Sequence, residues 1–356
     1  MDIVTGGAGF IGSHLVDRLI SDDPNRKLRI IDNLSVGSRR NLERHHDNPN
    51  VEFVEADVSD ASALVGLFVG CERVFHLAAR ADIVPSIEDP ELYFHANITG
   101  TLNVVQQAVG ANVRRFVYAA SSSCYGIPDD YPTSETAAIR PQYPYALTKY
   151  LGEEVVRHWA QLYDLPAVSL RLFNVFGPRA RTSGTYGAVF GVFLAQLLHD
   201  KPLTVVGDGT QTRDFTFVTD VVDALVTAAG SDKVGEVYNV GSGGTYSVKH
   251  LVELLGPRRV VYIPKRPGEP DRTFADVTKI HRELRWRARV SFEDGVKAVL
   301  DDIDYWRDAP LWAPDTIAEA TKGWFKYLQK SPAERTESDK SAQSPPGTDV
   351  IQRNPL

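Results

Sequence analysis

The chain has 356 residues, of which 43% are hydrophobic and 24% are charged. This composition is typical of a globular enzyme and allows one large domain with an appended lobe. The 39 Lys and Arg residues against 46 Asp and Glu give a net charge of −7. A mildly acidic chain argues against nucleic acid or a membrane as partner, because both attract a basic surface.

The cysteines and the first residues of the chain bear on the cellular compartment of the protein. Cys71 and Cys124, the two cysteines, form neither a CxxC pair nor a metal-binding spacing. The chain opens on the strand-like Met1–Val4 without the regions of a signal peptide, and it has no apolar run of about 18 residues that would cross a membrane. We therefore expect a cytoplasmic protein with reduced thiols and no metal site.

The first half of the chain alternates short apolar runs with amphipathic stretches. Strands are predicted at Ile3–Val4, Leu28–Ile31, Val51–Val54, Arg73–His76, Phe116–Ala119 and Ala167–Leu172. Helices are predicted at Ile11–Ile20, Ala61–Phe68, Asn97–Val109 and Pro144–Leu162. This alternation predicts an α/β fold, a Rossmann-type doubly wound parallel sheet over residues 1–175.

The pattern changes after residue 175, where loops rich in Gly, Pro and Arg alternate with short helices and strands. We expect residues 176–328 to form a smaller C-terminal substrate-binding lobe over the carboxyl edge of the sheet, with some later segments returning to the first domain. Residues 331–356 are rich in Ser, Pro, Lys and Glu without apolar periodicity, which predicts a disordered tail.

A glycine-rich turn follows the first predicted strand. Gly6, Gly9 and Gly12 lie, together with Phe10 and Ile11, in the segment Thr5–Gly12 that joins this strand to the first predicted helix. Glycine permits a tight turn and lets the backbone approach a pyrophosphate, and the helix N-terminus favours the anion. Such a spacing alone also fits a plain turn, but its place between a strand and a helix predicts a dinucleotide site.

Asp32 lies 20 residues beyond Gly12, at the end of the second predicted strand. Its carboxylate can accept hydrogen bonds from the adenosine ribose and would repel a 2′-phosphate, so NAD is the predicted cofactor. Arg39 and Arg40 follow closely and could accommodate that phosphate, which leaves NADP as the alternative.

Tyr145 and Lys149 lie four residues apart in a predicted helix and so share one face. A tyrosine with its ordinary pKa of about 10 is a poor base, but a neighbouring ammonium and a positive nicotinamide stabilise its phenolate. Ser121, Ser122 and Ser123 end the fifth predicted strand, where a hydroxyl can orient a substrate oxygen. The pattern predicts a catalytic centre of Tyr145, Lys149 and Ser121.

These motifs resemble, in content and order, those of the extended short-chain dehydrogenase/reductases, specifically the NAD-dependent sugar-nucleotide epimerases and dehydratases such as the UDP-glucose 4-epimerases. The resemblance covers about residues 1–325 and rests on Thr5–Gly12, Asp32–Ser35, Asp57–Val58, His76–Ala79, Asn97 with Gly100–Thr101, Ser121–Gly126, Tyr145 with Lys149, Arg171–Pro178 and Arg213–Asp214. It implies that Tyr145 is the general acid/base and that Lys149 also binds the nicotinamide ribose. It implies further cofactor contacts from Asn33, Ser35, Gly37, Asp57, Val58, Leu77, Ala78, Ala79 and Asn97.

The two positions after Ser121 distinguish the branches of this family. The 4,6-dehydratases carry Asp and Glu there and the decarboxylases carry Glu at the second, whereas this chain has Ser122 and Ser123. The resemblance therefore implies C4 epimerisation of a UDP-hexose, UDP-N-acetylhexosamine or UDP-hexuronate through a transient 4-keto intermediate. A reductase, dehydrogenase or dehydratase of the same family is the alternative. The intact catalytic residues disfavour a silent NAD-binding regulator.

The resemblance also implies a substrate site in the lobe, formed by Ser122, Ser123, Asn174, Arg213, Arg266, Glu269, Arg272 and Thr273. Loop arginines suit a diphosphate, although each alone also fits a solvated surface charge. Thr273 is small where bulky residues exclude N-acetylated hexoses. Arg179 and Arg181 are candidates to meet a uronate carboxylate.

Two expectations concern packing. Trp306, Trp312 and Trp324 are expected to pack late helices against the lobe and not to form a binding platform. Family analogy implies a homodimer through residues 97–109 and 144–162. The sugar, the nucleotide and the pathway stay open.

Overall fold

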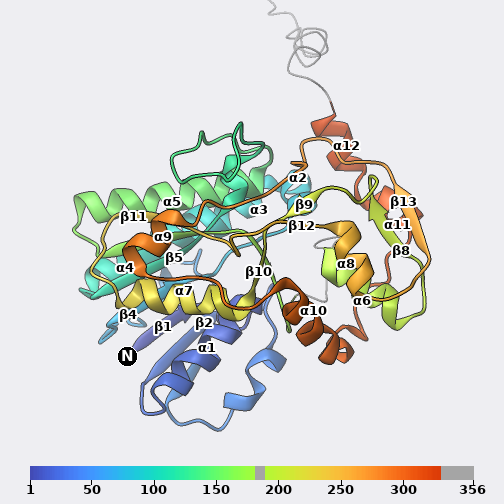
Figure 1. Ribbon diagram of the computed structural model, residues 1–356. Helices are drawn as coiled ribbons and strands as arrows, with labels where there is room; N and C mark the ends of the chain where they lie inside the picture. Colours follow the sequence, from blue (N-terminus) through green and yellow to red (C-terminus); the bar gives the residue numbers. More distant parts are fainter. Residues whose placement is uncertain (181–188, 330–356) are drawn as a thin grey trace, which may run out of the picture.

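A computed structural model describes residues 1–180 and 189–329. At its centre lies a seven-stranded sheet in the order β11-β6-β5-β4-β1-β2-β3, with every neighbouring pair parallel (Figure 1). Its strands are β1 (Asp2–Thr5), β2 (Leu28–Asp32), β3 (Val51–Glu55), β4 (Arg73–His76), β5 (Arg115–Ser121), β6 (Ala167–Leu172) and β11 (Glu236–Val240). The predicted Rossmann-type sheet is confirmed. Its strand order reverses between β1 and β4, where such sheets bind ligands.

Helices cover both faces of this sheet (Figure 1). On one face lie α1 (Phe10–Asp22) and α7 (Val218–Gly230), which pack on each other and on the strands through one apolar core. On the other face lie α4 (Gly100–Gly110) and α5 (Pro144–Leu162), with a second core beneath them. Burial on both faces explains why the strands read as continuous apolar runs.

Two predicted helices differ from the structure. The helix predicted at Ala61–Phe68 is wrong, since only a 3₁₀ turn forms at Ser62–Leu64. Gly66 has a φ of +79°, a left-handed conformation that ends a right-handed helix. The helix predicted from Asn97 begins instead as a π-helical turn, His95–Thr99, that leads into α4. The structure adds two short helices after β4, α2 (Ile83–Glu88) and α3 (Pro90–Phe94).

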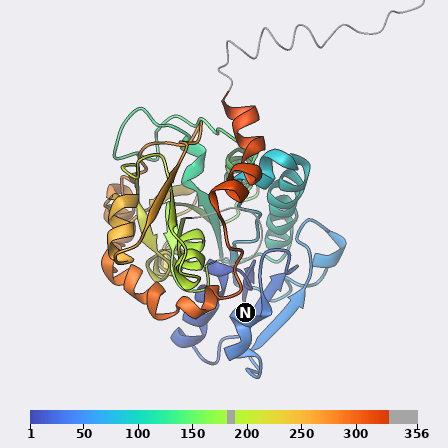
Figure 2. The ribbon, with the colours of Figure 1, turned by 90° about the vertical axis from the view of Figure 1, so that its right-hand side faces the viewer.

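Beyond β6 the chain builds a smaller lobe against the carboxyl edge of the sheet (Figure 2). Its core contains an aromatic cluster of Phe176, Phe190, Phe215, Phe217 and Phe292. The remaining strands are β7 (Asn174–Phe176), β8 (Leu203–Val206), β9 (Thr212–Arg213), β10 (Phe215–Phe217), β12 (Tyr246–Ser247) and β13 (Val260–Ile263). The remaining helices are α6 (Val189–Leu198), α8 (Val248–Leu254), α9 (Thr278–Leu284), α10 (Phe292–Asp301), α11 (Pro314–Ala320) and α12 (Lys322–Leu328).

Not all of the second half belongs to this lobe, because β11 and α7 are part of the central sheet and its cover, and α9 packs on β11. Within residues 1–180 and 189–329, no helix has the length and apolarity needed to cross a membrane. The tail predicted at 331–356 lies outside the described residues.

Candidate active site

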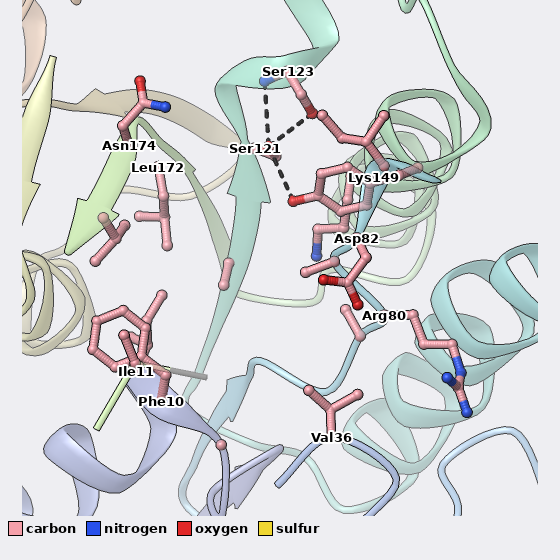
Figure 3. A pocket seen from close by; sticks show the side chains of 18 of the residues that line it. Phe10, Ile11, Val36, Arg80, Asp82, Ser121, Ser123, Lys149, Leu172 and Asn174 are labelled. Atoms are coloured by element: carbon pink, nitrogen blue, oxygen red, sulfur yellow. Dashed lines mark hydrogen bonds between the residues drawn. The ribbon is translucent and has the colours of Figure 1, made fainter. Parts of the chain in front are cut away.

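A cavity of about 710 Å³ opens between the carboxyl edge of the sheet and the lobe (Figure 3). It brings together residues that lie far apart in the sequence. The predicted site residues that line it are Gly6, Gly9, Phe10, Ile11, Gly12, Asp32, Asn33, Ser35, Gly37, Asp57, Val58, Leu77, Ala78, Ala79, Ser121, Ser122, Ser123, Tyr145, Lys149, Asn174, Arg213, Arg266, Glu269 and Thr273.

Two predicted site residues do not line the cavity. Asn97 is fully buried, and its side-chain amide donates to the Arg80 carbonyl at 3.0 Å and to the Thr148 hydroxyl at 2.9 Å. It therefore ties the segment after β4 to α5 from behind the cavity wall. The guanidinium of Arg272 lies over two rings, 4.9 Å from the centroid of Phe274 and 5.4 Å from that of Tyr131.

The glycine turn after β1 is a close-fitting cradle. Gly6 has a φ of +70°, and a Cβ there would lie 2.7 Å from the backbone nitrogen of Ala78. A Cβ at Gly12 would lie 2.2 Å from the Gly6 carbonyl oxygen. Only glycine fits such approaches, and the turn presents the N-terminus of the 13-residue α1 to the cavity. This geometry fits the pyrophosphate of a dinucleotide.

Asp32 ends β2 on the cavity wall beside that cradle. Its carboxylate accepts the backbone N–H of Ala8 at 3.0 Å and of Leu34 at 2.8 Å. Burial raises the pKa of Asp32, and these two hydrogen bonds oppose that rise. The carboxylate is thereby fixed where a ribose would lie.

The two arginines that left NADP open are directed elsewhere. Arg39 pairs with Glu55 at 2.8 Å, and Arg40 lies over the ring of Tyr305 at 5.0 Å. Neither lines the cavity. The site therefore fits NAD, because Asp32 is fixed at the ribose end and neither Arg39 nor Arg40 lines the cavity.

At the centre of the cavity the Tyr145 hydroxyl donates to the Ser121 hydroxyl oxygen at 3.3 Å (Figure 3). Ser121 also lies 2.8 Å from the Ser123 hydroxyl and accepts the Ser123 backbone N–H at 3.2 Å. Ser121 is the last residue of β5, and Tyr145 follows Pro144, whose fixed φ suits the first position of α5. Two rigid elements therefore set this contact.

Lys149 lies one turn further along α5, 96% buried, with its ammonium 4.3 Å from the Tyr118 ring centroid. Burial lowers the pKa of Lys149 to about 7, and nearby Glu153 opposes that effect. Burial also raises the pKa of Tyr145, against the lowering effect of the Ser121 hydrogen bond. The sequence predicted a lowered tyrosine pKa from Lys149, so desolvation is the effect that this prediction left out.

Asp82 is a cavity residue that the sequence analysis missed. It precedes α2 and lines the wall near Lys149 (Figure 3). Its negative charge raises the pKa of Tyr145 further. No sequence motif marked this carboxylate, because its position depends on how the segment after β4 folds toward α5.

A buried ion pair attaches α5, the helix that carries Tyr145 and Lys149, to the central sheet. Arg171 of β6 makes two hydrogen bonds to Glu153 of α5, at 2.9 and 2.6 Å, and donates to the Tyr125 hydroxyl at 2.9 Å. Tyr125 donates in turn to Asn239 of β11 at 2.6 Å. These bonds join α5 to β6, to β11 and to the turn Ser122–Tyr125 that follows Ser121.

The lobe contributes arginines to the other end of the cavity. Arg213 pairs with Glu269 at 2.7 Å, and Arg266 lies 3.8 Å from the other oxygen of the same carboxylate. Thr273 donates its hydroxyl to the Asn174 side-chain oxygen at 2.7 Å. Two cavity-lining guanidiniums next to one carboxylate leave an excess of positive charge, which suits a diphosphate.

Arg179 does not meet the cavity, so the expectation that it contacts a uronate carboxylate is wrong. Its guanidinium donates to Asp17 at 2.6 Å and to the backbone carbonyl of Asn41 at 3.2 Å, on α1 and the segment after β2. Arg181, the second candidate, lies outside the described residues.

Three further aromatic residues line the cavity, Tyr143, Trp312 and Trp324. Trp306 is fully buried in the lobe core, as expected. The expectation that all three tryptophans only pack is wrong for Trp312 and Trp324, because the chain beyond α10 returns to the cavity.

A dinucleotide cradle beside a tyrosine, a lysine and a serine at one sheet edge defines a short-chain dehydrogenase/reductase. Residues 3–241 match the NAD dependent epimerase/dehydratase family, and the chain belongs to that family, whose cofactor is NAD. It is 37% identical over 307 residues to the UDP-glucose 4-epimerase of Mycolicibacterium smegmatis, covering 84% of this chain and 97% of that relative. It is 32% identical over 315 residues to the human dTDP-D-glucose 4,6-dehydratase, covering 84% and 88%.

The solved structures that resemble this chain include enzymes named for other sugar nucleotides. A UDP-N-acetylglucosamine 4-epimerase from Methanobrevibacter ruminantium superposes with a TM-score of 0.81 at 32% identity, covering 85% of this chain and 98% of that one. A UDP-glucuronic acid 4-epimerase from Bacillus cereus, solved with NAD, superposes with a TM-score of 0.79 at 32% identity, covering 86% and 99%. The similarity thus places the chain among enzymes of sugar nucleotides.

Proposed function

We propose that this protein epimerises a sugar nucleotide at C4, with NAD as cofactor and Tyr145 as acid/base. The observation that carries the proposal is the hydrogen bond between Tyr145 and Ser121 at the middle of the cavity, 3.3 Å long. On one side lies the glycine cradle and on the other lie the arginines of the lobe. A sugar nucleotide with its diphosphate at the arginines would present its sugar to Tyr145.

The residues of the chain have distinct tasks in this reaction. Ser121 orients the C4 hydroxyl, and Tyr145 accepts its proton and later returns it. Lys149, one turn away, binds the nicotinamide ribose and its positive charge favours the phenolate. NAD held by the glycine cradle and Asp32 would supply reversible hydride transfer at C4, so the cofactor would not be consumed.

The contacts of cofactor and substrate follow the cavity wall. The cradle holds the pyrophosphate, Asp32 holds the adenosine ribose, and Asp57 and Val58 flank the adenine. Arg213 and Arg266 hold the substrate diphosphate while the 4-keto sugar turns over. Asn97 and Arg272 have no contact role in this proposal, because neither lines the cavity.

A dehydratase or decarboxylase needs a carboxyl group just after Ser121 by family analogy, and this chain has Ser122 and Ser123 there. This difference favours an epimerase over the dehydratases that are also its relatives. A net reductase or dehydrogenase would use the same tyrosine, and it is distinguished by its consumption of cofactor.

The test is NMR of the purified protein in D₂O with UDP-hexoses, UDP-N-acetylhexosamines and UDP-hexuronates, without added reductant. We expect one sugar class to give its C4 epimer without deuterium at C4 and without net NADH. A product that accumulates only with stoichiometric NADH would establish the oxidoreductase instead. Loss of the C6 oxygen would establish the dehydratase.

We further propose a cytoplasmic homodimer. The dimer is supported by apolar side chains exposed on α5, since Leu147 is 37% and Leu162 58% exposed. The cytoplasmic location is supported by two free, buried cysteines, Cys71 and Cys124.

A further inference from the structure

The last described helix of the chain, α12, lies beside α2 at the rim of the active-site cavity (Figure 1). It falls outside residues 3–241, the part that matches the family. Its Trp324 lines the cavity yet is only 2% exposed, so the indole is enclosed by its neighbours. The identity of these neighbours indicates its role.

Trp324 contacts two segments that carry site residues. Its indole N–H donates to the Pro267 carbonyl oxygen at 2.6 Å, and the Arg266 guanidinium lies 5.3 Å from the ring centroid. The ring of Tyr143 lies 6.3 Å away, centroid to centroid. The indole thus connects the loop of Arg266 with the residue that precedes α5.

The Arg266 loop and Tyr143 each contact residues of the proposed reaction. Arg266 lies 3.8 Å from Glu269, which pairs with Arg213 of β9. The loop of Arg266 and Glu269 and the strand β9 therefore hold the two guanidinium groups beside one carboxylate. Tyr143 stacks on Tyr145, with centroids 6.4 Å apart and planes 7° apart. Trp324 therefore lies between the proposed diphosphate anchors and the proposed acid/base.

Trp306, in the same lobe, serves as a comparison, because it is a tryptophan that only packs in the core. It is fully buried in the apolar core of the lobe, and its indole N–H has no hydrogen-bond partner within residues 1–180 and 189–329. Trp324 instead donates to loop backbone and lies against a guanidinium and a tyrosine ring. Its surroundings are those of the active site.

We propose that Trp324 is a positioning residue for the substrate, through which α12 holds the Arg266–Glu269 loop at a fixed distance from Tyr145. Helix α12 thereby becomes part of the substrate site. This inference rests on the proposed function. A small displacement of an anchoring loop is costly for catalysis, because reacting groups must be held in a narrow range of geometry.

The test compares full-length Trp324→Ala and Trp324→Phe with Tyr327→Ala, a change on the same helix at a residue 54% exposed. The measurements are KM and kcat for the sugar nucleotide that the wild type turns over, UDP affinity by calorimetry, and bound NAD per chain. We expect Trp324→Ala to raise KM and weaken UDP binding about ten-fold or more, with bound NAD unchanged. Trp324→Phe, which keeps the ring and loses the N–H, should lie between, and Tyr327→Ala should match the wild type.

Three outcomes overturn the inference. The first is that the KM and the UDP affinity of Trp324→Ala stay within two-fold of the wild type. The second is that kcat and bound NAD fall in both Trp324 variants while KM and UDP affinity do not change. Either result would show that Trp324 has only a structural role. If Trp324→Ala does not fold, Trp324→Phe decides by the same criteria. A wild type that neither turns over a sugar nucleotide nor binds UDP refutes the proposed function, and the inference with it.

Discussion

The proton transfer assigned to Tyr145 depends on the charges that face its hydroxyl. Burial and the carboxylate of Asp82 raise the pKa of Tyr145, while the 3.3 Å hydrogen bond with Ser121 lowers it, because the Ser121 hydroxyl can donate to the phenolate. Because the base form of Tyr145 is the phenolate, activity rises with pH through the pKa of this tyrosine. Asp82 therefore sets part of the pH dependence.

We predict that Asp82→Asn shifts the acid limb of the pH profile of kcat/KM to lower pH. The amide removes a negative charge that raises the pKa of Tyr145, so the phenolate forms at a lower pH. Glu91→Gln, an exposed acid on the neighbouring α3, is the matched control and should leave the profile unchanged. A profile that moves to higher pH in Asp82→Asn would contradict the assignment of the acid limb to Tyr145.

Thr273 lines the cavity beside the arginines of the lobe, at the proposed substrate site. Its hydroxyl is held between the Asn174 side chain at 2.7 Å and the Asp214 backbone N–H at 2.9 Å. We predict that Thr273→Tyr lowers kcat/KM for UDP-N-acetylhexosamines relative to UDP-hexoses, by about ten-fold, because the larger ring takes the space of the acetamido group. Competition assays with both substrates measure this ratio. An unchanged ratio would show that this position does not select the substrate.

At the scale of elements, α5 is attached to the sheet by a charge pair that water cannot reach. The side chains of Arg171 and Glu153 are 5% and 1% exposed. We predict that Glu153→Gln lowers the free energy of unfolding by about 3–5 kcal/mol, since it leaves a buried guanidinium without its counter-charge. Glu154→Gln is the control at the next residue, where the ion pair with Arg157 is 39% and 40% exposed and contributes about 0–1 kcal/mol. Urea unfolding measures both, and equal losses would contradict this account.

The cradle at the start of α1 gives a second comparison, between two glycines in helices. A Cβ at Gly12 would lie 2.2 Å from the Gly6 carbonyl oxygen, whereas one at Gly110 in α4 would meet nothing within 4 Å. We predict that Gly12→Ala loses bound NAD and, with it, activity, because the turn must open to admit the methyl group. Gly110→Ala should retain both. Retention of NAD by Gly12→Ala, measured by absorbance after denaturation, would contradict the cradle geometry.

The elements also show how far sequence reasoning reaches. All six predicted strands and the catalytic helix follow from local apolar patterns, and the cradle follows from three glycines. The helix predicted at Ala61–Phe68 failed because Gly66 takes a left-handed conformation that apolar periodicity does not show. Asp82, Tyr143 and Trp324 could not be predicted as cavity residues, since their places depend on segments that meet only after folding.

At the scale of the whole molecule, the central sheet and its helical cover receive β11 and α7 from the second half of the chain, which therefore contributes to both the sheet and the lobe. The cavity lies at the carboxyl edge of the sheet, whereas α5 covers one of the sheet's faces. Leu147 and Leu162 are exposed there, and Tyr163, which follows, is 49% exposed. Apolar side chains exposed together on one element suit a partner of the same kind, because a two-fold axis pairs each patch with itself.

The last prediction is therefore that light scattering gives a mass of twice the 39.4 kDa chain. Replacing both Leu147 and Leu162 by Glu should return the mass to that of a single chain, because charges at the centre of an apolar contact cost more than the contact contributes. Tyr262→Glu is the control, since Tyr262 is 58% exposed on β13 of the lobe, which lies away from α4 and α5 (Figure 1). A monomeric wild type, or a double variant that stays dimeric, would refute the interface.

The same interface has a consequence for stability. Leu147 lies between Tyr145 and Lys149 in the sequence, so a dimer through α5 would also hold the catalytic helix in place. The monomeric variant should therefore unfold at a lower temperature than the wild type.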